Sequence, residues 1–240
     1  MDKQEHGFPA VIFTRNVDNF LKINTMAIQL NFQKTERILF CASKWWGDPD
    51  MPANMEYPTI EVTEEGETYD YPLTFLCQIN CEDIAALDPE GKLPHEGMLY
   101  FFAAIDRWHG FDSPTTNDRG EWPKGHCIVK YAKAINFETF NTCMLTDDDD
   151  QSLTDPELEI TFSECADDAP VCRLLGKPSS AETAEAMPEM LNFLQIVPDQ
   201  LLELDFGSQD SFCNFMIKDS DLHFGNWKRA KVYIDNKKIK

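Results

Sequence analysis

The chain has 240 residues, of which 42% are hydrophobic and 26% charged, and its formal net charge at pH 7 is −21. This apolar content suffices for a sizeable core, and no apolar run approaches the roughly 18 residues that cross a membrane as a helix. So negative a surface argues against DNA, RNA and anionic membranes as partners and is compatible with a basic protein partner.

The charge is unevenly distributed. Residues 147–210 contain 17 Asp and Glu against two cations, whereas residues 211–240 contain seven Lys and Arg against three Asp. We expect the acidic segment to steer the protein toward a positive surface. The opening MDKQEHGFPAVIF carries charges of both signs and a short apolar patch, which is unlike a signal peptide and favours a cytoplasmic location.

The eight cysteines are expected to be free thiols. Several lie inside short apolar runs, such as 75–77 and 127–129, where cysteine behaves as a small buried hydrophobe. Cys77 and Cys81 have the spacing C-x3-C, and no second pair completes a zinc site. The sequence contains none of the common catalytic motifs, so no catalytic residue, metal or cofactor is predicted.

Along the chain, residues 26–32 alternate between apolar and polar side chains, which is typical of a strand with one buried face. A turn at 33–35 is expected to pair this strand with residues 37–42 as a hairpin. Residues 43–58 are loop by composition. Residues 74–80 and 98–105 are short apolar runs that indicate buried strands, separated by a brief helical turn and a Gly/Pro loop.

Beyond a second loop at 107–123, strands are expected over 126–131, 158–162 and 231–234. Residues 179–187 give the best helix pattern, with serine at the N-cap and glutamate in the first turns. Strands without regular helical crossovers predict an α+β protein with mainly antiparallel sheets and a few short helices. We expect one compact domain over residues 1–240.

The pair of strands expected at 74–80 and 98–105 resembles a second segment near the C-terminus. Residues 76–80 (LCQIN) align with 201–205 (LLELD), and residues 99–101 (LYF) align with 222–224 (LHF). The number of residues that separate the two matching segments differs by only two between the copies. This predicts an internal duplication with units near 74–106 and 200–235.

The first loop contains the most promising candidate binding residues. Indole rings flanked by charges can stack on a ring or anchor a partner, although the same rings could instead close one end of the core. Gln78 is expected to satisfy buried backbone groups and to form a polar centre with its counterpart in the second unit. The candidates are Lys44, Trp45, Trp46, Asp48, Asp50, Gln78, Trp108, His109 and Glu203.

Six segments of the chain form an ordered series of motifs: 43–52, 57–58, 72–80, 93–102, 175–178 and 201–205. Together they resemble the YwqG-like family, bacterial proteins grouped as a domain of unknown function. The resemblance spans about residues 43–225 and departs from the family pattern at Trp46, Tyr57 and Lys177. It implies an α+β duplication rich in antiparallel strand and supplies no activity.

The leading functional prediction is a non-enzymatic, acidic protein-interaction module. One version is an immunity-type antagonist of a basic toxin. The alternative is a small-ligand binder or an enzyme that uses a pocket between the two repeat units, with the loops 43–52 and 107–122 at its rim. The sequence does not fix the oligomeric state.

Overall fold

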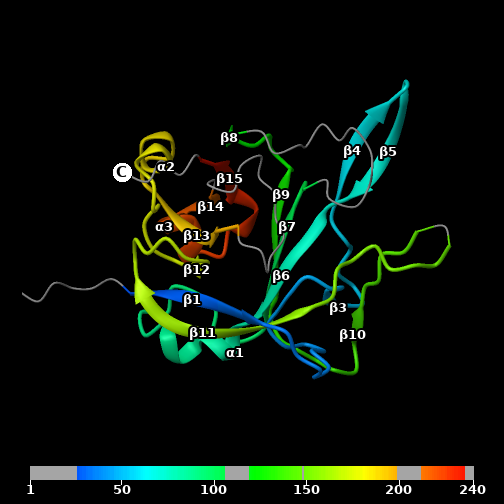
Figure 1. Cartoon of the computed structure of the whole chain (residues 1–240), viewed down its shortest axis with the longest axis horizontal. Helices are drawn as coiled ribbons and strands as arrows, with labels where there is room; N and C mark the ends of the chain where they lie inside the picture. The colour runs from blue at the N-terminus through cyan, green and yellow to red at the C-terminus, as the bar shows by residue number, and fades with distance from the viewer. Residues whose placement is uncertain (1–25, 106–118, 148, 199–211, 236–240) are drawn as a thin grey trace, which may run out of the picture.

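The computed structural model describes residues 26–105, 119–147, 149–198 and 212–235. Of the described residues, 43% lie in strands and 12% in helices, so the protein is mostly β and the expected α+β class is wrong (Figure 1). The expected helix at 179–187 is confirmed over Ala181–Ala186, but the helices of the described ranges are short and build no layer of their own. None of the helices in the described ranges has the length and apolar character needed to span a bilayer.

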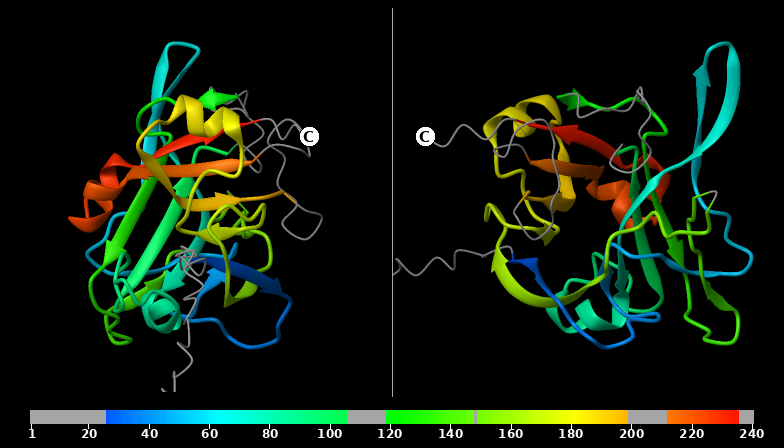
Figure 2. Two further views of the ribbon diagram at one scale, coloured as in Figure 1. Left: turned by 90° about the vertical axis from the view of Figure 1, so that its left-hand side faces the viewer. Right: turned by 45° about the vertical axis from the view of Figure 1, so that its right-hand side comes forward.

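Eleven strands form one curled antiparallel sheet that resembles half of a barrel (Figure 2). Their order across the sheet is β8-β15-β14-β13-β12-β1-β11-β2-β6-β7-β9. The strands are β1 (Met26–Gln33), β2 (Lys44–Trp45), β6 (Thr74–Asn80), β7 (Met98–Ala103), β8 (Gly120–Glu121), β9 (Cys127–Ala132), β11 (Leu158–Ala166), β12 (Arg173–Leu174), β13 (Met190–Ile196), β14 (Cys213–Lys218) and β15 (Lys231–Ile234).

Two small antiparallel pairs stand beside this sheet. β3 (Asp50–Pro52) pairs with β10 (Phe140–Thr142), and β4 (Thr59–Glu64) forms a hairpin with β5 (Glu67–Pro72). The remaining elements are α1 (Cys81–Ile84), η1 (Ala85–Leu87), α2 (Ala181–Ala186), α3 (Asp219–His223) and η2 (Trp227–Arg229). The Ser180 hydroxyl caps α2 by accepting from the Thr183 N–H, as its sequence predicts.

The expected strands at 26–32, 74–80, 98–105, 126–131, 158–162 and 231–234 are confirmed, two of them with the expected ends (74–80 and 231–234) and the others within four residues at their ends. The expected hairpin of 26–32 with 37–42 is wrong. β1 pairs with β11 and β12 instead, and residues 37–42 form no strand. Alternation shows which face of a strand is buried but does not identify the strand that pairs with it. A strand that is distant in the sequence can therefore be the partner in place of a local hairpin.

The core lies on both faces of the sheet, and β7 shows this most clearly. Phe101 points to the concave side, where its ring meets Phe193 at 5.1 Å and Phe215 at 5.5 Å. Tyr100 and Phe102 point to the opposite side and belong to a second buried cluster, which includes residues of β3 and β10. Because both faces are covered, every residue of β7 is buried and the strand is continuously apolar.

The β1–β11 pair lies near the middle of the sheet. Moving outward, β12, β13, β14, β15 and β8 follow β1, while β2, β6, β7 and β9 follow β11. The expected repeat register fails: residues 99–101 lie in β7, whereas Leu222 and His223 lie in α3, and residues 201–205 lie outside the described ranges.

Candidate functional site

Three of the predicted site residues meet in a buried polar cluster beneath the 43–52 loop. Lys44 on β2 lies opposite Gln78 on β6, and its Nζ atom lies 3.0 Å from Asp50 Oδ2 and 3.1 Å from Glu157 Oε2. The Gln78 amide donates to Asp50 Oδ2 and accepts from the Asp50 N–H, both at 2.8 Å. Gln78 also donates to a backbone carbonyl at 2.9 Å, which confirms that it satisfies buried backbone groups, whereas the polar centre expected with Glu203 falls outside the described residues.

Asp50 is the centre of this cluster and is fully buried. Its Oδ2 atom also accepts from the Cys41 N–H at 2.9 Å, and its Oδ1 atom accepts from the Thr142 hydroxyl at 2.7 Å. The Tyr100 hydroxyl donates to its backbone carbonyl at 2.7 Å. The carboxylate is thus fully engaged within the protein, so this cluster ties strands together and presents no free general base.

The two tryptophans of the loop are core residues. Trp45 is 0% and Trp46 3% exposed, and the Trp45 ring meets Phe32 edge-on at 5.5 Å. Neither indole presents a face to solvent, which favours the alternative that they close one end of the core. The other aromatic and polar candidates, Trp108, His109 and Glu203, lie outside the described residues.

A second polar cluster repeats the first one across the sheet, and sequence reasoning missed it. Arg173 on β12 lies opposite Gln195 on β13, as Lys44 lies opposite Gln78, and both side chains are fully buried. The Gln195 amide donates to the Val171 carbonyl at 2.9 Å. The pattern that could have revealed it is SKWWG at 43–47 against CRLLG at 172–176, each followed later by Gln-Ile.

Above the first cluster lies a pocket of about 560 Å³ with surplus negative charge. Asp48 accepts from the Leu145 N–H at 3.2 Å, and burial raises the pKa of its carboxyl group despite that bond and the neighbouring Lys44. Four carboxylates against one ammonium line the cavity. The lining residues with ionisable side chains are Lys44, Asp48, Asp50, Asp155 and Glu157.

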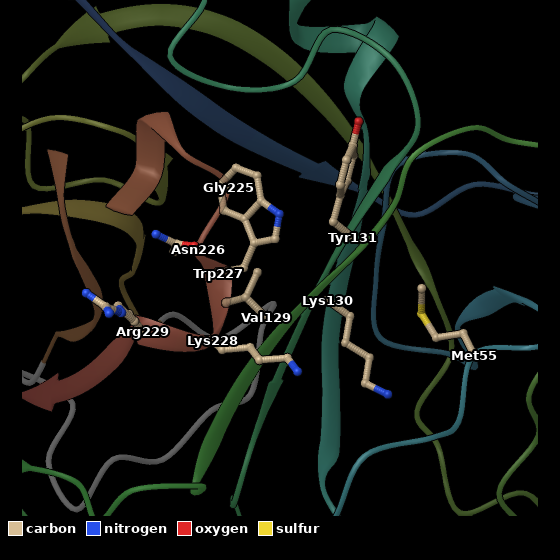
Figure 3. A pocket seen from close by; sticks show the side chains of 9 residues that line it. All are labelled: Met55, Val129, Lys130, Tyr131, Gly225, Asn226, Trp227, Lys228 and Arg229. Carbon is tan, nitrogen blue, oxygen red and sulfur yellow. The ribbon is translucent and has the colours of Figure 1, made fainter. Parts of the chain in front are cut away.

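A different pocket, of about 610 Å³, lies where the curled sheet brings its last strand against η2 (Figure 3). On β9 it is lined by Val129, Lys130 and Tyr131, and on the other side by residues 225–229. The Trp227 ring stacks on Phe193 at 5.4 Å and meets Tyr131 edge-on at 5.9 Å. This pocket is cationic and aromatic, on a protein whose net charge is strongly negative.

The cysteine thiols are poorly suited to nucleophilic chemistry. Burial raises the pKa of Cys41 to about 11 and those of Cys81 and Cys127 to about 12. Burial also raises the pKa values of Cys77 and Cys213 well above the usual range. A catalytic thiol needs the opposite shift, because the thiolate is the nucleophile. Within the described ranges, no group of three or more His, Cys, Asp and Glu side chains is arranged to hold a metal.

Fold and sites together define a mostly β protein, built on a curled antiparallel sheet with buried polar clusters and two pockets of opposite charge. A family model matches residues 43–235, which is most of the chain and includes the span in which the motif resemblance was found. The chain therefore belongs to the family described as Domain of unknown function (DUF1963). No curated protein matches the chain.

Proposed function

We propose that this protein is a non-enzymatic binding module, a YwqG-like member of its family, that captures a basic segment of a protein partner. The observation that carries the proposal is the acidic pocket above Lys44 and the exposed apolar side chains beside it. We call this surface the acidic face and define it by the pocket-lining residues Ile38, Asp48 and Asp155, together with Phe137 and Met144.

The charges of this pocket favour a cationic occupant. Lys44 is paired with Asp50 and Glu157, and it is one ammonium group among the four carboxylates of the lining. Burial raises the pKa of Asp48, which means that its charged form is poorly solvated. A lysine or arginine of a partner would add positive charge beside Asp48 and lower that pKa.

Exposed apolar side chains lie at the rim of the same pocket. Ile38 lines it with 89% of its surface exposed. Phe137 is 68% exposed and packs against the pocket residue Phe40 at 6.1 Å. Met144 is 64% exposed and precedes Leu145, whose N–H donates to Asp48. Large apolar side chains beside desolvated charges are typical of the centre of a protein interface.

The specific version of this proposal is a cytoplasmic antagonist that covers a positive surface of a basic protein, as an immunity protein covers its toxin. Long-range attraction by the net charge of −21 would speed the encounter, and the acidic face would fix the register. The raised pKa values of the cysteine thiols support a binding role over nucleophilic catalysis.

The test places a photo-crosslinking amino acid at Ile38 in the source organism and identifies the captured protein by mass spectrometry. The same label at the half-exposed Tyr69, on the separate β5 hairpin, is the control for proximity. The captured protein, once purified, is titrated against wild type, against Asp48→Asn/Asp155→Asn, and against Glu164→Gln/Glu185→Gln. The last variant removes the same charge at exposed sites elsewhere.

We expect a basic partner to crosslink at position 38 and not at position 69. Its affinity should fall about tenfold or more in the Asp48/Asp155 variant, which corresponds to about 1.4 kcal/mol, and fall less in the control. The proposal fails if the partner is acidic, if both double variants lose the same affinity, or if no protein is captured at position 38.

A further inference from the structure

The pocket between β9 and η2 is independent of the acidic face and has the opposite charge. It exists because the two ends of the sheet approach one another: the Cys127 thiol on β9 lies 3.5 Å from the carbonyl of Ala230, which follows η2. The gap left beside this contact is the cavity of about 610 Å³. That volume lies within the range of natural small-molecule sites, roughly 300–1,000 Å³.

Two ammonium groups converge on this cavity from different elements. Figure 3 shows Lys130 of β9 and Lys228 of η2 extending toward the same side of the pocket. Lys130 donates to the backbone carbonyl of Glu56. In the ranges that the structure describes, no carboxylate forms an ion pair with either lysine, whereas the third cation, Arg229, is paired with Asp221 at 3.1 Å.

The environment of Lys130 disfavours its positive charge, which an anionic ligand would stabilise. Burial lowers the pKa of Lys130, the carboxylate of Glu56 opposes this shift, and the charge of Lys228 adds a smaller lowering. Two like charges held near one another in a partly dehydrated cavity repel each other. A dianion placed between them would remove this repulsion and stabilise both charged forms.

The remaining walls suit a flat apolar group. One face of the Trp227 indole is stacked on Phe193, and Val129, Met55 and Tyr131 add apolar surface around it. Gly225 leaves part of this indole uncovered: a Cβ atom at that position would lie 3.6 Å from the ring atoms Cε2 and Cζ2. A side chain longer than a methyl group there would occupy the space that a ligand ring needs.

We propose that this pocket binds a small phosphate ester that carries a planar ring, the chemical class of nucleotides. Its phosphate lies between Lys130 and Lys228, and its ring packs against Trp227 and Tyr131. Binding at this site does not depend on the acidic face. A nucleic acid chain is a different partner, and the overall charge of −21 would repel its extended backbone.

The test is calorimetric titration of the full chain with adenosine monophosphate, adenosine and inorganic phosphate. We expect the monophosphate to bind at least about tenfold more tightly than either fragment, because only it engages both halves of the site. Affinity should fall as the salt concentration rises. Equal affinity for adenosine would refute the phosphate site, and equal affinity for inorganic phosphate would refute the ring site.

Variants locate the binding. Lys130→Met/Lys228→Met should weaken the monophosphate at least about tenfold. The matched control is Lys231→Met, which removes a half-exposed lysine of β15 that pairs with Glu121 and does not line the pocket, and should change the affinity little. Circular dichroism checks that the variants fold. Absence of saturable binding by wild type, unchanged binding in the double variant, or an equal loss in the control would overturn the proposal.

Discussion

Breaking the buried ion pair between Lys44 and Asp50 should destabilise the protein strongly. Both side chains are at most 3% exposed, and their charged atoms lie 3.0 Å apart. The change Lys44→Met leaves a buried carboxylate without a counter-charge, which typically costs about 3–5 kcal/mol of unfolding free energy. We expect the lower end of that range, about 3 kcal/mol, because Asp50 keeps the three donors described above.

The reciprocal change, Asp50→Asn, should cost less. Lys44 then keeps its second partner, Glu157, whose side chain is 33% exposed and hydrated. The double variant Lys44→Met/Asp50→Asn removes both charges, so its loss should fall short of the sum of the single losses by about 1.5 kcal/mol or more.

Urea unfolding followed by circular dichroism measures all three changes, with the midpoint and slope compared among variants. The control is Arg37→Met, which removes a cation that is 70% exposed and should cost less than about 1 kcal/mol. Additive single losses, or a loss below about 1 kcal/mol for Lys44→Met, would refute the argument that the cluster is a coupled buried network.

Two further predictions concern a close approach of the backbone and the effect of pH. Gly97→Ala should lower the melting temperature far more than Gly66→Ala. Both glycines have positive φ, but a Cβ at Gly97 would lie 2.1 Å from the Ala132 carbonyl oxygen, whereas nothing lies within 4 Å at Gly66; equal shifts would contradict this. Burial lowers the pKa of His126, so its contribution to stability is present above the unfolded pKa of about 6.5 and is lost as pH falls below it. Relative to His126→Gln, wild type should therefore lose stability between about pH 7 and pH 5.5, and a constant difference in unfolding free energy would refute the shift.

The sequence by itself determined the local elements and the family. Apolar alternation located β1 and β11, and the apolar run at 98–105 indicated a buried strand, which the structure shows as β7. A lone glutamine within an apolar strand correctly predicted that Gln78 satisfies buried backbone groups. These features depend on the period and chemistry of side chains that are close in the sequence, so they can be predicted without the tertiary structure.

Only the tertiary structure decided which strands pair, where the sheet ends meet and which side chains are exposed. β1 joins β11 and β12 across long stretches of chain, and its period carries no information about those partners. The composition of the 43–58 loop allowed Trp45 and Trp46 to be either binding residues or core residues. The tertiary structure buries both. The cationic pocket combines Lys130 and Lys228 from opposite ends of the sheet, so its charge and shape arise only when the sheet curls.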